Sequence, residues 1–145
     1  MAYWRAAAVV DAPPDRVWRA LVEWEASDWM VPPTTVEVVG ERRAGIGTRV
    51  RAVSVIARVL RLVDTMVVTN WIDEREIRVR HVGWMVRGDG IFRLTPGARG
   101  VTRFEWIEDL VLPFGIVGEV IGLLLRPVAQ RYLRRSLARF ALRVT

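Results

Sequence analysis

The sequence of 145 residues has no cysteine, no lysine and a single histidine, His81. Without cysteine the chain can form no disulfide bond, no thiolate nucleophile and no zinc–thiolate site. One histidine with scattered carboxylates also lacks the spacing of a metal-ligand set. We therefore expect neither a metal site nor a cofactor, and His81 is the obvious candidate for any acid–base chemistry.

Long hydrophobic runs are also missing. The run Val120–Leu125 is the most tempting membrane span, but Glu119 and Arg126 bracket it, and it is far shorter than the roughly 20 residues that a spanning helix needs. The first residues show no basic region followed by an apolar stretch, which a secretory signal requires. These absences predict a cytoplasmic protein without a transmembrane segment.

Positive charge predominates, since 22 arginines face 16 acidic residues and the net charge is +6. Nucleic-acid binding is the function that such a charge suggests first. However, the arginines are spread over the whole chain and accompany no nucleic-acid-binding motif. We expect no nucleic-acid partner, and we expect several arginines to pair with carboxylates through their planar guanidinium groups.

The order of the predicted elements is informative. Residues 3–11 predict an apolar first strand, and Pro13-Pro14 then opens an amphipathic helix over residues 14–23. Trp24–Met30 is expected to form a second short helical turn, which Pro32-Pro33 ends. Short apolar stretches with turn residues between them then predict an antiparallel meander. Its strands cover residues 35–41, 48–56, 61–72 and 76–85, a sixth strand that follows Gly88-Asp89-Gly90 and runs through Thr95, and residues 101–110.

The last segment, Pro113–Thr145, predicts one long helix with an apolar side and an arginine-rich side. One strand, a helix, a run of strands and a final long helix indicate a single α+β domain over residues 1–145. We expect a strongly curved antiparallel sheet of seven strands that wraps around the terminal helix. Such an arrangement leaves an apolar hollow between the sheet and the helix.

Strand alternation predicts which side chains line this hollow. A turn centred on Asp73 places Trp71 opposite Ile77 and Val67 opposite His81. Alternation then turns Val67, Thr69 and Val79 to the same inner face, with arginines on the outer face. By the same reasoning the last two strands contribute Phe92, Leu94, Thr102, Phe104, Trp106 and Glu108. An aromatic lining with few polar groups is typical of a small-molecule site.

Several segments resemble the START/Bet v 1-like (SRPBCC) superfamily, especially its bacterial polyketide cyclase/dehydrase and lipid transport branch. The resemblance covers essentially the whole chain and rests on the order of Ala12–Trp18, Gly45–Val50, Trp71–Ile77, Gly100–Trp106 and Arg135–Leu137. It implies a helix-grip fold, in which seven curved strands grip a C-terminal helix around an elongated cavity. Members bind lipids, sterols, polyketides or quinones, and some cyclise or dehydrate polyketide chains, so the resemblance constrains fold better than function.

The candidate site residues follow from the predicted lining. His81 and Glu108 are the catalytic candidates, because burial against Trp106 disfavours an ionised carboxylate, as a general acid requires. Their structural alternatives are a histidine hydrogen-bonded between strands and a salt bridge from Glu108 to an arginine. The predicted ligand-binding residues are Trp29, Val67, Thr69, Trp71, Val79, His81, Trp84, Phe92, Phe104, Trp106, Glu108, Ile121, Leu124, Val128 and Tyr132.

Three functions remain open from the sequence. The favoured one is a carrier that binds a hydrophobic small molecule, as a monomer or homodimer. The second is a polyketide cyclase or aromatase in which His81 and Glu108 transfer protons. The third is peripheral contact with a membrane through the arginine face of the last helix, Arg126 to Arg143.

Overall fold

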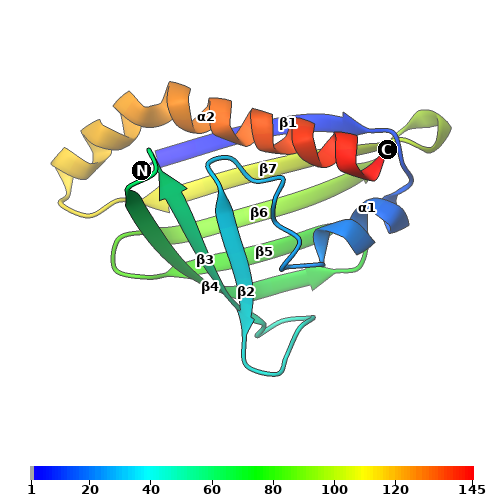
Figure 1. Ribbon diagram of the computed structural model, residues 1–145, viewed down its shortest axis with the longest axis horizontal. Helices are drawn as coiled ribbons and strands as arrows, with labels where there is room; N and C mark the ends of the chain where they lie inside the picture. Colours follow the sequence, from blue (N-terminus) through cyan, green and yellow to red (C-terminus); the bar gives the residue numbers. More distant parts are fainter. Residues whose placement is uncertain (1) are drawn as a thin grey trace.

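The computed structural model describes residues 2–145 and forms one seven-stranded antiparallel sheet with a long C-terminal helix (Figure 1). Across the sheet the strand order is β1-β7-β6-β5-β4-β3-β2, so the first strand pairs with the last. This architecture confirms the helix-grip fold expected from the sequence. The elements are β1 (Ala2–Val10), α1 (Pro14–Leu21), β2 (Thr34–Val39), β3 (Arg49–Ile56), β4 (Leu60–Ile72), β5 (Glu76–Val82), β6 (Arg87–Pro96), a 3-10 turn (Ala98–Gly100), β7 (Thr102–Val111) and α2 (Ile116–Val144).

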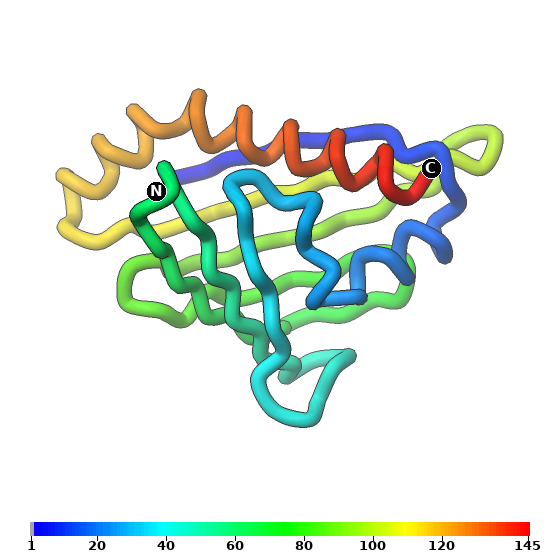
Figure 2. The backbone as a smooth tube through the Cα atoms, in the orientation of Figure 1, coloured from blue at the N-terminus to red at the C-terminus, as the bar shows by residue number. Residues whose placement is uncertain are grey.

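The sheet is strongly curved. In Figure 1, β2 and β3 cross in front of the strands that follow them, and Figure 2 shows the backbone of β4 turning from one half of the sheet into the other. α2 runs beside β1 and packs mainly against that strand. Phe140 of α2 contacts Phe104 of β7, with ring centroids 5.1 Å apart. The helix therefore lies on the concave side of the sheet, where the core is.

Burial alternates along the strands as the sequence predicts. In β1, Ala2, Ala6 and Val10 are buried, and the residues between them are partly or fully exposed. Edge-to-face and tilted contacts then join five rings of the core, with neighbouring centroids 5.0 to 6.5 Å apart. We call this group the aromatic cluster: Trp29, Phe92, Phe104, Trp106 and Phe140. It fills the interior beside the second half of α2.

Only one of the two helices expected after β1 is present. α1 begins with Pro14 in its first turn, where proline loses no hydrogen bond, and it buries Val17, Trp18 and Leu21. The expected second helical turn at 24–30 is wrong, since residues 22–33 form only isolated turns. Trp24 and Trp29 are both buried, and at five residues apart they would point about 140° away from each other on a helix. Separate turns let both indoles reach the core.

Two neighbouring strand boundaries also differ from the expected ones, since the fifth strand, predicted over 76–85, ends at Val82. Gly88 and Gly90 do not precede the sixth strand but lie inside β6, where they pair with His81 and Val79 of β5. Gly88 has φ +118, and a Cβ there would lie 2.2 Å from the carbonyl oxygen of Asp109. A residue with a side chain cannot occupy this position without a backbone shift. The glycines are part of the sheet and mark a close approach between strands.

The two halves of α2 pack differently. In the second half, Leu137, Phe140 and Val144 are buried, whereas in the first half the only buried residues are Gly118 and Gly122. A Cβ at Gly122 would lie 3.0 Å from the Cβ of Ala2. Gly122 thus lets the helix backbone approach β1 closely, and Gly118 lets it approach the carbonyl oxygens of Leu112 and Pro113. The apolar stripe predicted to face the hollow points elsewhere. Among the described residues, no helix is long and apolar enough to cross a membrane.

Candidate functional site

A β-bulge in β4 decides which side chains face the interior. Trp71 pairs with Ile77, as predicted, but Val68 and Asn70 pair with the consecutive residues Val79 and Arg78. Thr69 is therefore the extra residue; it is exposed, and its hydroxyl donates a hydrogen bond of 3.3 Å to the carbonyl oxygen of Arg78. A bulge of this kind reverses the alternation of inner and outer residues beyond it.

The predicted pairing of Val67 with His81 is consequently wrong. Met66 pairs with His81, and Val67 pairs with Arg80 of the outer face. Beyond the bulge the concave side receives Val68, Met66 and Asp64. Asp64 is the functional candidate that sequence reasoning missed, because uninterrupted alternation counted from Trp71 places it outside. A carboxylate in an otherwise apolar strand was the available signal.

Asp64, His81 and Glu108 form a continuous hydrogen-bonded chain on the concave face. The imidazole Nδ1 of His81 lies 2.9 and 2.8 Å from the two carboxylate oxygens of Asp64. Its Nε2 lies 2.8 Å from Oε2 of Glu108. The indole Nε1 of Trp106 donates to the other oxygen of Glu108 at 2.7 Å. Residues from β4, β5 and β7 thus meet at one point, which we call the carboxylate–imidazole chain.

The protonation of His81 follows from its two carboxylate partners. Burial of the ring by itself lowers the pKa of His81, but hydrogen bonds and opposite charges from Asp64 and Glu108 outweigh it and raise the pKa from 6.5 to about 10. The ring is therefore an imidazolium at neutral pH, and both of its N–H groups donate. It is a poor proton acceptor in this state, which limits a role as a general base.

Gly90 makes room for this arrangement. It lies in β6 between His81 and Glu108, and a Cβ there would lie 3.0 Å from Oε2 of Glu108 and 3.1 Å from Nε2 of His81. Any side chain at this position would crowd the two atoms that form the hydrogen bond between His81 and Glu108. The absence of a side chain at residue 90 is therefore a condition for the His81–Glu108 contact.

The carboxylate–imidazole chain places net negative charge on an apolar wall. One imidazolium lies between two carboxylates, so the three groups together carry one negative charge when both carboxylates are ionised. Side-chain exposure is 4% for His81, 12% for Glu108 and 19% for Asp64. Asp64 is thus the member most accessible to a ligand, and its oxygens can each accept a further hydrogen bond.

The structure confirms the predicted orientation of most strand residues. Trp71, Val79, His81, Phe92, Phe104, Trp106 and Glu108 face the concave side. Phe104 is completely buried in the aromatic cluster. Trp29, which is also a predicted ligand-binding residue, is almost completely buried there. Phe92 and Trp106 are partly accessible at its edge. Val67 and Thr69 lie outside this face because of the bulge.

The remaining predicted residues lie around one end of the interior. Trp84 is 73% exposed in the turn between β5 and β6. Ile121, Leu124 and Val128 are exposed on the first half of α2, and Tyr132, at the junction of its two halves, is half-buried. Each of these residues remains a predicted ligand contact.

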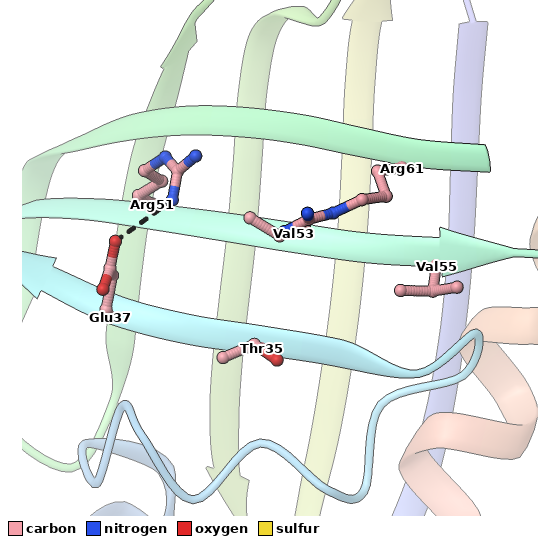
Figure 3. A pocket seen from close by; sticks show the side chains of 6 residues that line it. All are labelled: Thr35, Glu37, Arg51, Val53, Val55 and Arg61. Atoms are coloured by element: carbon pink, nitrogen blue, oxygen red, sulfur yellow. Dashed lines mark hydrogen bonds and ion pairs between the residues drawn. The ribbon is translucent and has the colours of Figure 1, made fainter. Parts of the chain in front are cut away.

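Two hollows on the surface of the described residues lie away from the concave face, where the sequence predicts a hollow. The first, of about 230 Å³, lies on the outer face of β2, β3 and β4, where Glu37 pairs with Arg51 at 3.2 Å beside Val53, Val55 and Arg61 (Figure 3). The second, of about 250 Å³, lies beside the β4–β5 turn, near Arg75 and Arg93. On the concave side, Leu62, Asp64 and Met66 are partly exposed. This end of the interior is accessible, whereas the aromatic cluster fills the other end.

Among the described residues, no group of histidine and acidic side chains is arranged to hold a metal ion. In the carboxylate–imidazole chain both ring nitrogens already bond to carboxylates, which leaves no nitrogen lone pair for a metal. The arrangement can instead accept hydrogen bonds from a ligand, or donate a proton from the imidazolium if a ligand displaces a carboxylate. Both are chemistry of a small-molecule site.

Comparison with known proteins gives one family and many structural neighbours. The family model described as "Polyketide cyclase / dehydrase and lipid transport" matches residues 1–145. No curated protein matches the sequence. The solved structure of TTHA0849 from Thermus thermophilus is 24% identical, with a TM-score of 0.81 over 98% of this chain and 96% of that one.

Two further neighbours carry informative descriptions. The Zhui aromatase/cyclase from Streptomyces sp. R1128 is 20% identical, with a TM-score of 0.79 over 98% of this chain and 92% of its own. A START superfamily protein from Mycobacterium smegmatis is 14% identical, with a TM-score of 0.78 and 99% of each chain covered. At these identities the neighbours establish the fold.

Proposed function

Because the chain belongs to the polyketide cyclase/dehydrase and lipid transport family, we propose that it binds a hydrophobic small molecule on the concave face of the sheet. The observation that supports this most is the carboxylate–imidazole chain of Asp64, His81 and Glu108 on an otherwise apolar wall. A buried charge costs free energy unless it is paired, and here the pairing leaves one accessible carboxylate. Apolar walls with a few directed polar groups are the usual construction of ligand sites.

The charge of the carboxylate–imidazole chain indicates which class of ligand can bind beside it. Its net negative charge disfavours a bound carboxylate, since two like charges at close range in a poorly solvated site repel. Asp64 instead accepts a hydrogen bond from a neutral donor such as an alcohol or phenol. The ligand we propose is therefore apolar over most of its surface, uncharged, and carries at least one hydroxyl group.

Equilibrium binding to a matched pair of ligands tests this proposal. A long-chain alcohol and the fatty acid of the same chain length differ only in the head group, and isothermal titration at neutral pH compares them directly. A hydrogen bond to a charged group contributes about 1.5–3 kcal/mol, so we expect the alcohol to bind roughly tenfold more tightly or better. In Asp64→Asn this preference is reduced.

Neighbouring residues on opposite faces of β4 provide the control. Met66→Phe adds bulk to the concave face, and Val67→Phe adds bulk to the outer face of the same strand. We expect Met66→Phe to weaken binding at least tenfold, whereas Val67→Phe leaves it unchanged. Equal effects of both substitutions, or no binding of either ligand by the wild type, would refute the proposed site.

A cyclase or aromatase reaction is the second candidate, and the 2.8 Å contact between His81 and Glu108 favours it. In a dehydration, Glu108 would accept a proton from a carbon beside a carbonyl, and the imidazolium of His81 would donate one to the departing hydroxyl, which leaves as water. The ring must first be released from a carboxylate, because both of its N–H groups are engaged.

Enzymatic turnover separates the two candidates. With a poly-β-ketone analogue as substrate, an enzyme shows product formation that is lost in His81→Ala and in Glu108→Gln while ligand binding by Glu108→Gln is retained. A carrier binds the analogue and returns it unchanged. Conversion at the same rate in wild type and Glu108→Gln would exclude proton transfer by this carboxylate.

A further inference from the structure

The first half of α2 exposes an unusual amount of apolar surface. Six large side chains there and in the preceding connection are at least 50% exposed: Phe114, Ile116, Val117, Val120, Leu123 and Leu124. The five of them that belong to the helix span about 120° of its circumference, on the side opposite the buried Gly118 and Gly122. We call these six residues the apolar cap. An exposed apolar surface of this extent marks an interaction site.

Two other apolar tips lie at the same end of the molecule. Val59 and Leu60 at the β3–β4 turn are 85% and 59% exposed, and Trp84 at the β5–β6 turn is 73% exposed. In Figure 1 both turns lie at the left, as does the connection from β7 to α2. A small hydrophobic cluster joins them, since Leu62, Val86 and Leu112 pack with the buried Ala2 and Leu110. The apolar cap and the two turns therefore extend from the same small hydrophobic cluster.

Arginines flank these exposed apolar segments along the sequence. Arg58 and Arg61 flank Val59 and Leu60, Arg87 follows the Trp84 turn, and Arg126 and Arg131 follow the cap on α2. All five are exposed, and within the described chain none of them forms an ion pair with an acidic side chain. Glu119 is the one acidic residue of α2. Apolar side chains beside unpaired cations match the two layers of an anionic bilayer surface, acyl chains below charged head groups.

We propose that this end of the protein docks on the surface of a bilayer that contains anionic lipid. The cap and Trp84 enter the boundary between head groups and acyl chains, where an indole is particularly favourable. The arginines bind lipid phosphates. A second copy of the chain is a poorer occupant, because a two-fold contact through the cap would bring Arg126 and Arg131 of both copies together without acidic partners.

Vesicle flotation with the full-length protein tests the proposal. One set of vesicles contains phosphatidylcholine alone, and the other contains equal parts of phosphatidylcholine and phosphatidylglycerol. We expect the wild type to float with the anionic vesicles and to be released as salt is raised. Since exposing one buried leucine costs roughly tenfold or more in affinity, Leu124→Glu should lose most of the bound fraction.

Leu142→Glu is the matched control. Leu142 lies on the same helix, five turns from Leu124 on the same face, and is 81% exposed, but it belongs to the other half of α2. This variant should float like the wild type, and the circular dichroism of both variants should show that they fold. Equal loss in the two variants would contradict a site at the cap. A wild type that stays unbound and is instead a dimer converted to monomer by Leu124→Glu would overturn the proposal in favour of self-association.

Discussion

Glycine 90 and the three polar residues beside it show how single side chains create the candidate site. Gly90 leaves the space in which Nε2 of His81 and Oε2 of Glu108 meet. Asp64 holds the other ring nitrogen, so His81 has one orientation and keeps its proton. The site is therefore a fixed cation between two carboxylates. This arrangement suits the orientation of a ligand better than it suits general-base catalysis, which needs an imidazole that titrates freely.

The titration of His81 is the first prediction at this scale. Because His81 is the only histidine, its imidazole signals in a nuclear magnetic resonance spectrum need no assignment. The raised pKa of His81 predicts a midpoint near 10. Glu108→Gln removes one of the two carboxylate partners and should move the midpoint downward. A midpoint near 6.5 in the wild type would show that the hydrogen-bonded chain does not form in solution.

Stability against pH gives a second prediction. The folded-state pKa of His81 lies above its unfolded value of 6.5, so the folded protein binds more protons between pH 6.5 and about 10. This contribution to the free energy of unfolding is fully present below pH 6.5 and is lost as pH rises toward 10. The absence of lysine and cysteine leaves few other groups that titrate in this window.

Denaturant unfolding at several pH values checks the sign of this effect. We expect the wild type to lose more stability between pH 6.5 and 10 than His81→Gln, which keeps the tyrosines and arginines of the wild type. A difference between the two proteins that stays constant over this window would contradict the linkage.

At the scale of elements, the bulge in β4 determines the inner face of the sheet. The sequence predicts the strands, the Asp73 turn and the Trp71–Ile77 pair, because turn residues and alternating hydrophobicity are local signals. Thr69 carries no such signal: a bulge of this kind is specified by the curvature of the whole sheet. For this reason the orientation of Val67, Thr69 and Asp64 could not be predicted, whereas that of His81 and Glu108 could.

Deletion of Thr69 tests the role of the bulge. Removing this residue restores plain alternation, which forces either Asp64 and Met66 or Trp71 onto the wrong face. We expect a large loss of stability, more than about 4 kcal/mol, as for other changes that break a buried network. Thr69→Val keeps the extra residue, removes only the 3.3 Å hydroxyl contact, and should change stability by less than about 1 kcal/mol. Folding of the deletion variant with native stability would exclude this account.

In α2, too, the sequence does not show which side of the element is buried. Its length and its arginines are evident from the sequence, yet the buried side of its first half is made by Gly118 and Gly122 instead of the apolar stripe. Hydrophobic periodicity identifies the side of a helix that is usually buried, but it cannot show that a close backbone contact with Ala2 outweighs it. The exposed residues then become a candidate surface for a lipid bilayer.

At the scale of the whole molecule, the curved sheet and α2 divide the interior into two unequal parts. The aromatic cluster closes one end, and partly exposed side chains from β4 to β7 remain at the other, next to the carboxylate–imidazole chain. The order of elements was enough to predict the helix-grip fold. The extent of filling depends on how particular aromatic rings interlock, and the sequence holds no local signal for that.

Indole resonances measured with bound ligand test the central claim most directly. The protein has seven tryptophans, which individual Trp→Phe variants assign in a nitrogen–proton correlation spectrum. With a saturating hydroxylated apolar ligand, we expect the signal of Trp106, whose indole bonds to Glu108, to shift strongly. The signal of Trp24, whose indole donates to the carbonyl oxygen of Arg43 at 2.9 Å, should stay in place. Saturation of the protein with ligand while the Trp106 signal does not move would contradict binding at the concave face.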